Sequence, residues 1–162
     1  MKKSTILLLV VVYILSFFVI GLLGNSVRSY YPVYEPESIE LVDPDGKTDL
    51  TRDVEKDGEI IDYWFVYHGY VAGSVVRIKA SVKPDNSTYP NVTFVKDAQN
   101  TAFAMETHAT NESVEDNFAV FSVTPGSEPS TLNPAVAAQF TVISQNPGIQ
   151  IKIKACIVFG LY

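Results

Sequence analysis

The sequence predicts an all-β protein, an antiparallel immunoglobulin-like β-sandwich preceded by one N-terminal transmembrane helix. Three observations lead to this prediction. The run 5–24 contains no charge, the sequence after residue 38 has a hydrophobic period of two, and turn residues separate about eight short β-branched runs. A single Cys among 162 residues excludes a disulfide framework, so burial of apolar side chains must hold the fold together.

The uncharged run is long enough to cross a bilayer. At about 1.5 Å per residue, a helix over 5–24 spans the ~30 Å hydrocarbon core. Lys2 and Lys3 precede the run and only Arg28 follows closely, so the positive-inside rule places the N-terminus in the cytoplasm. We expect three parts: a cytoplasmic start with the transmembrane helix (1–24), a linker or stalk (25–37) and an extracytoplasmic β-sandwich domain (38–162).

Two other interpretations of this opening segment stay open. A cleaved signal peptide usually has an apolar stretch of only ~7–15 residues, and a cut after Gly24 would place the large Leu22 at the −3 position. Lys2-Lys3-Ser4 also fits a short prepilin-type site, at which cleavage would leave the helix as a filament core. The length of the run favours a retained membrane anchor.

The period of two predicts eight strands after the linker. In the strand predicted over 75–82, Val76 and Ile78 face one side while Arg77 and Lys79 face the other, as in a sheet that is buried on one face. The predicted strands are 39–42, 60–70, 75–82, 92–95, 101–107, 118–123, 137–144 and 149–159.

The last predicted strand supplies candidate contact residues. Its isoleucines alternate with polar residues, which places Cys156 on the outward phase together with Val158. Tyr162 lies three residues beyond the end of this strand. Cys156, Val158 and Tyr162 therefore form a candidate interaction surface, although a covering loop would hide the same residues.

An acidic segment near the start of the domain resembles a calcium loop. Asp43, Asp45 and Asp49 supply hard oxygen ligands around Gly46, which permits a sharp bend. A third ligand before the glycine and a bidentate Glu beyond it are not at their usual places. Pro44-Asp45-Gly46 is also a common turn sequence, so we expect a turn first and a calcium site as the weaker alternative.

The sequence contains no recognisable catalytic or cofactor-binding motif. His68, His108 and Cys156 lack the spacing of a cupredoxin copper site, and no known nucleophile, phosphate-loop or zinc motif occurs. Trp64 lies in an aromatic run that is typical of a buried central strand, with a sugar-stacking platform as the alternative. We therefore expect no enzymatic activity and no cofactor.

Three N-x-[ST] sequons begin at Asn86, Asn91 and Asn111. All three fall in expected loops or at a strand edge on the side inferred to lie outside the membrane. We expect glycosylation there in a eukaryotic or archaeal host, and ordinary turn residues in a bacterial one.

The charge balance excludes nucleic acid as a partner. The whole chain has a formal charge of -6, and without residues 1–24 it has ten Lys and Arg against 18 Asp and Glu, a balance of -8. Eleven of these carboxylates lie between residues 35 and 62. Binding to a phosphate backbone requires clustered cations, which this acidic chain lacks.

The sequence therefore predicts a single-pass protein of the cell membrane that makes protein contacts, as an accessory subunit of a membrane complex or as a surface scaffold. Its expected partners are other envelope proteins, with homo-oligomers as a further option. In overall layout the chain resembles archaeal filament-associated proteins, including archaellum stator components and pilin-like subunits, which makes a filament or stator subunit the runner-up. A calcium- or carbohydrate-dependent adhesin is the third hypothesis.

Overall fold

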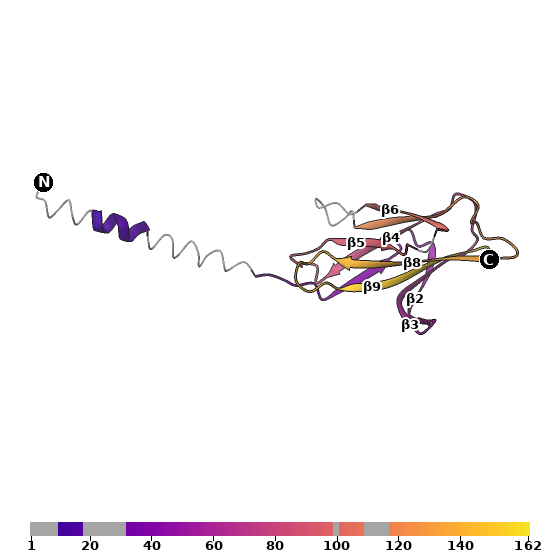
Figure 1. The fold of residues 1–162 in the computed structure, drawn as a ribbon, viewed down its shortest axis with the longest axis horizontal. Helices are drawn as coiled ribbons and strands as arrows, with labels where there is room; N and C mark the ends of the chain where they lie inside the picture. The colour runs from indigo at the N-terminus through magenta and orange to yellow at the C-terminus, as the bar shows by residue number, and fades with distance from the viewer. Residues whose placement is uncertain (1–9, 18–31, 99–100, 109–116) are drawn as a thin grey trace, which may run out of the picture. The chain divides into compact units, whose positions relative to one another are not determined.

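The computed structural model describes residues 10–17, 32–98, 101–108 and 117–162 (Figure 1). The chain divides into two compact units, Met1–Val33 and Tyr34–Tyr162. In the first unit, residues 10–17 are helical and the Ser16 hydroxyl donates a hydrogen bond to the Val12 carbonyl at 2.8 Å. Among the described residues no helix has the length and apolar character needed to cross a membrane. Most of the predicted span 5–24 lies outside the described residues.

The second unit is a β-sandwich. Its described residues form nine strands in two sheets, with the order β1-β4-β7-β6 in one sheet and β2-β3-β9-β8-β5 in the other. All eight predicted strands are present, and one more, β2, was not predicted. The strands are β1 (Ser38–Val42), β2 (Thr48–Lys56), β3 (Glu59–Tyr67), β4 (Val75–Lys83), β5 (Val92–Lys96), β6 (Phe103–His108), β7 (Phe118–Val123), β8 (Ala135–Ser144) and β9 (Lys152–Gly160).

The prediction of a fully antiparallel sandwich is wrong at one pair of strands. β3 and β9 run parallel, with Tyr63 opposite Ala155 and Tyr67 opposite Phe159, while every other pair of neighbouring strands is antiparallel. Parallel neighbours need a long connection, and here strands β4 to β8 lie between β3 and β9 in the chain. No local pattern marks such a pairing.

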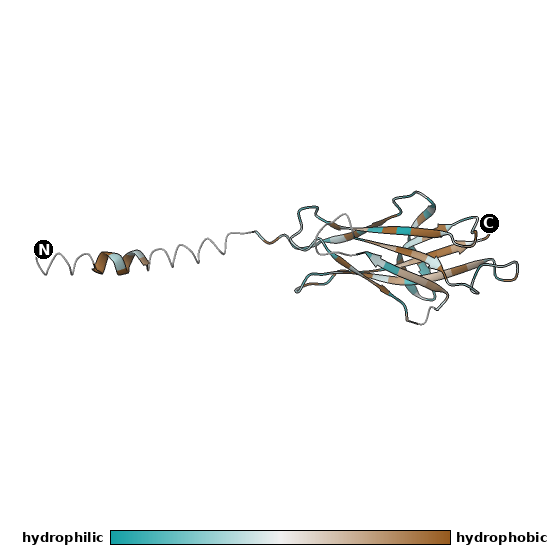
Figure 2. Ribbon diagram, turned by 90° about the horizontal axis from the view of Figure 1, so that it is seen from above, coloured by the Kyte–Doolittle hydropathy of each residue, from teal (hydrophilic) through white to brown (hydrophobic). Residues whose placement is uncertain are grey.

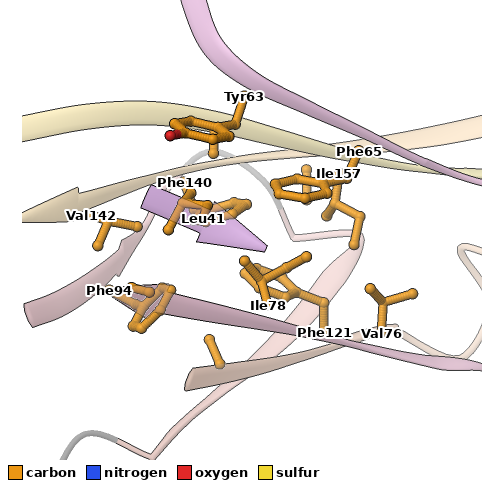
Figure 3. Packing of buried hydrophobic residues seen from close by; sticks show 14 of the residues in the cluster. Leu41, Tyr63, Phe65, Val76, Ile78, Phe94, Phe121, Phe140, Val142 and Ile157 are labelled. Carbon is orange, nitrogen blue, oxygen red and sulfur yellow. The ribbon is translucent and has the colours of Figure 1, made fainter. Parts of the chain in front are cut away.

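The core lies between the two sheets and follows the alternation along the strands. On β4, Val76 and Ile78 are fully buried while Arg77 between them is exposed. Figure 2 shows this alternation as changes of hydropathy along single strands. In Figure 3 labelled side chains of both sheets point into one space, where the rings of Phe121 and Phe140 lie 4.5 Å apart between centroids. The prediction that burial holds this domain together is consistent with this continuous apolar cluster.

Hydrogen bonds fasten the first residues of the second unit to the sandwich. The Tyr34 amide donates to the Thr88 hydroxyl at 2.9 Å and the Thr88 amide returns a bond to the Tyr34 carbonyl. The Asn146 side chain, itself buried, donates to the Glu35 carboxylate. Tyr34 and Glu35, which we expected in the linker, are thus held against two loops of the domain.

Strand β2 joins β3 through a tight hairpin at one edge of the five-stranded sheet. Asp57 and Gly58 both have positive φ, 54° and 80°, as a two-residue type I′ turn requires. β2 has almost no buried residue, because the core covers neither of its faces. In Figure 1 the hairpin curves away from the strands beside it.

Candidate functional site

The Asp43 carboxylate organises a turn. One of its oxygens accepts a hydrogen bond from the Asp45 amide at 2.9 Å. The other accepts from the Lys47 amide at 2.7 Å and from the amide and hydroxyl of Thr48 at 2.8 and 2.9 Å. These four donors occupy the acceptor sites that a cation would use, so this carboxylate acts as a side-chain cap of the turn.

The structure does not bring Asp43, Asp45 and Asp49 together as a calcium site. Asp45 forms an ion pair with Lys47 at 3.3 Å, and the Asp49 carboxylate lies 3.2 Å from Nε2 of His68. Within the part of the chain that the structure describes, no group of three His, Cys, Asp or Glu side chains could hold a metal ion. The segment is a turn, the first of the two sequence interpretations.

His68, considered above only as a copper ligand, contacts two segments that are far apart in the sequence. Its Nδ1 lies 2.6 Å from the carbonyl oxygen of Tyr162, and its Nε2 faces the carboxylate of Asp49. The histidine therefore links the start of β2 to the residues that follow β9. Tyr162 itself is 82% exposed, so the phenol ring remains free to contact a partner.

Two alternatives were open for Cys156, exposure on the outward side of the strand or cover by a neighbouring segment, and the structure shows the covered one. The residue has no exposed surface, although it lies on the outward phase of β9 as the alternation predicted. Trp64 of β3 is opposite Cys156 in the parallel register, and the Lys56 ammonium lies 5.3 Å from the centre of the Trp64 ring. Trp64 and Lys56 thus lie close to the buried thiol.

Burial also controls the chemistry of this thiol. It raises the pKa of Cys156 to about 11, and the nearby positive charge of Lys56 lowers that pKa only in part. A thiol with so high a pKa is a poor nucleophile at neutral pH. Of the three predicted contact residues, Cys156 is buried, Val158 is half-buried and Tyr162 is exposed.

Trp64 is half-buried and its ring face is occupied. The Lys56 ammonium stacked on the ring leaves that face unavailable for a sugar, while the neighbouring Tyr63 and Phe65 point into the core. The prediction of a central strand buried on both faces is correct for one face only. β3 lies between β2 and β9 within its sheet and buries Tyr63 and Phe65, but Trp64 on the other face is half-buried.

Two of the three sequons fall on described residues. Asn86 is exposed in the loop after β4, and Asn91 is partly exposed just before β5. In the first sequon the hydroxyl of Ser87 donates to the Tyr34 carbonyl at 3.2 Å, so this sequon lies where the domain begins. Asn111 lies outside the described residues.

The outer face of the four-stranded sheet carries a mixed apolar and basic surface. The register places four residues in one row across this sheet: Val42 on β1, Lys79 on β4, Phe118 on β7 and His108 on β6. The Phe118 ring stacks on His108 with centroids 4.6 Å apart, and the Arg77 guanidinium lies 5.1 Å from its centre. We call the surface made of Val42, Arg77, Lys79, His108, Phe118 and Val120 the basic face.

The tip of the β2–β3 hairpin has the opposite charge. Glu55 and Ile60 are opposite each other in the register and share one face, and Ile60 is 63% exposed. Asp57 lies at the turn between them. We call Glu55, Asp57 and Ile60 the acidic tip.

A hollow of about 290 Å³ lies beside the hairpin on the five-stranded sheet, between Glu59 of β3, Gln139 and Thr141 of β8 and Val95 of β5. The Glu59 carboxylate and the Lys154 ammonium form an ion pair at 2.8 Å on its wall. Lys96 and Asp97 also line the hollow, so its lining carries two positive and two negative side chains and no formal excess of either charge.

A comparison with models of protein families finds no match, and a comparison with curated proteins finds none either. The membrane-length apolar run and the two charged surfaces of the sandwich are the features from which a function can be proposed.

Proposed function

We propose that this chain is a single-pass membrane protein whose β-sandwich lies outside the membrane and contacts other proteins of the cell envelope. The uncharged run 5–24 with Lys2 and Lys3 before it supports a retained anchor with a cytoplasmic N-terminus. The protein would act as an accessory subunit of a membrane complex or as a surface scaffold.

The strand order supports an immunoglobulin-like sandwich. The sheet β1-β4-β7-β6 has the order A-B-E-D of immunoglobulin domains, and β5-β8-β9 has the order C-F-G. β2 and β3 extend the second sheet beyond β9. Such sandwiches are common in cell-surface proteins, in which the sheets present flat surfaces to partners.

The basic face is the observation that carries the proposal of protein contact. Its Phe118 and Val120 are half-buried and Val42 is 44% exposed, so the sheet presents apolar area to solvent. Arg77 and Lys79 border that area and form no ion pair within the described residues. An apolar patch bordered by charges that no neighbour neutralises is typical of an interaction surface.

The membrane placement is tested with the full chain tagged at both ends. In sealed right-side-out vesicles from expressing cells, added protease should remove the C-terminal tag and leave the N-terminal tag intact. Carbonate washing should leave the protein in the membrane fraction. Protein recovered in the soluble fraction, or a mature N-terminus near Asn25, would show a cleaved leader and contradict the anchored function.

The intact mass of the mature protein tests the filament alternative, which the Lys2-Lys3-Ser4 start supports. Loss of the first four residues would indicate prepilin-type processing, and a retained Met1 would exclude it. The same mass reports glycans at the sequons of Asn86, Asn91 and Asn111, since each attached glycan adds a discrete increment.

A further inference from the structure

We propose that the basic face of one molecule binds the acidic tip of a second copy of this chain. The inference deepens the proposed function and rests on it, because it names the partner of the contact surface. It also explains why an acidic domain keeps a sheet face with two cations, Arg77 and Lys79, that form no ion pair within the described residues.

The basic face offers a binding surface with apolar and charged parts. The Phe118 ring, held between His108 and Arg77, forms its centre, and Val42 and Val120 extend the apolar area along the register. The Lys79 side chain is opposite Phe118 on the neighbouring strand. Glu106 lies opposite Val120 in the register and pairs with His108 at 3.5 Å.

The acidic tip has the complementary composition. Ile60 projects an apolar side chain that is 63% exposed, and the carboxylates of Glu55 and Asp57 flank it. Neither carboxylate forms an ion pair within the part of the chain that the structure describes. We infer that Ile60 packs against Phe118 and Val120 while the two carboxylates approach Arg77 and Lys79.

This contact uses two different surfaces, so it is heterologous. The basic face belongs to the four-stranded sheet and the acidic tip to the five-stranded sheet. Each copy can therefore bind one neighbour through its face and another through its tip, and association continues beyond a dimer unless a ring closes. Opposite charges at its rim make the contact sensitive to salt.

The test is sedimentation of the full chain in density-matched detergent over a range of protein concentrations. We expect species larger than dimers in 20 mM salt and mainly monomers in 500 mM salt. The variant R77E/K79E should associate at least about tenfold more weakly than the parent chain. Lys152→Glu is the matched control, because Lys152 is an exposed residue of β9 outside both surfaces, and this variant should associate as the parent does.

A second variant, E55K/D57N, changes the acidic tip; asparagine is chosen at position 57 because it tolerates the positive φ of that residue. R77E/K79E alone and E55K/D57N alone should each stay monomeric. Their mixture should associate again, because each then offers a surface whose charge complements the other. Unchanged melting temperatures would show that both variants fold.

Monomers of the parent chain at every concentration, or undiminished association of R77E/K79E, would overturn the proposal. The proposal would also be overturned if R77E/K79E and E55K/D57N each failed to associate alone and their mixture stayed monomeric as well. None of these results would affect the vesicle experiment on membrane placement, so failure of the self-contact and failure of the proposed function are distinguishable.

Discussion

The thiol of Cys156 provides a direct test of whether the outward side of β9 is covered at this position. Side-chain alternation places this residue outward, and the structure buries it completely opposite Trp64. If that cover exists in solution, alkylation of the native protein must be slow for two reasons. The reagent cannot reach the sulfur, and the sulfur is rarely ionised.

The ionisation effect can be worked out from the pKa. With a pKa of about 11, about one thiol in a thousand is ionised at pH 8, against about one in eleven for a thiol at the ordinary value of 9.0. Ionisation alone therefore slows alkylation about a hundredfold, and the lack of exposed surface slows it further. The rate should rise about tenfold for each pH unit up to pH 10, because the thiolate fraction does so in that range.

The assay follows iodoacetamide labelling of the full chain in mild detergent by mass spectrometry, with the urea-unfolded chain at the same pH as reference. The control is a chain with Cys156→Ala and Leu132→Cys, because Leu132 is 97% exposed and its replacement should be labelled without delay. A native rate within tenfold of the unfolded rate at pH 8, or a plateau below pH 9.5, would refute the buried thiol.

Three further predictions concern stability, each measured by unfolding of the full chain in mild detergent. Asp43→Ala should lower the free energy of unfolding by about 1–3 kcal/mol, because four hydrogen-bond donors lose their acceptor. In the parent chain, neither calcium nor a chelator should change the melting temperature. A melting temperature that falls on chelation would restore the calcium interpretation. Phe121→Ala should cost about 3–5 kcal/mol, since this ring is buried against Phe140; a loss below 1 kcal/mol would contradict that packing. Gly58→Ala should cost about 1–2 kcal/mol for the positive φ alone, since an added Cβ meets no atom within 4 Å, and an unchanged stability would contradict the type I′ turn.

Alternation was a reliable guide to the strands that line the core. In β4 and β9 every second side chain is apolar and packs between the sheets, so the local sequence is enough to place the strand and its inward face. The same rule placed Arg77 and Lys79 outward correctly. It could not show that Phe118 and His108 lie beside them, because that depends on the pairing of β7 with its two neighbours.

The strand β2 escaped prediction because it has no buried face to impose an apolar period. Its sequence is mostly charged, as suits an exposed strand at the edge of a sheet. One signal was available: Asp57-Gly58 is a favoured pair for a two-residue hairpin, and only Glu59 separates it from the apolar pair Ile60-Ile61 of β3. A hairpin turn at Asp57-Gly58 predicts a strand on its N-terminal side, which is where β2 lies.

The sequence by itself determined the class of the fold, the inward faces of its strands and the turn at Asp43, because each depends on residues that are close together in the chain. Only the tertiary structure decided that β3 runs parallel to β9, that the outward Cys156 is covered and that cations collect around Phe118. These features arise where distant segments meet, and neither segment carries a local signal of its neighbour.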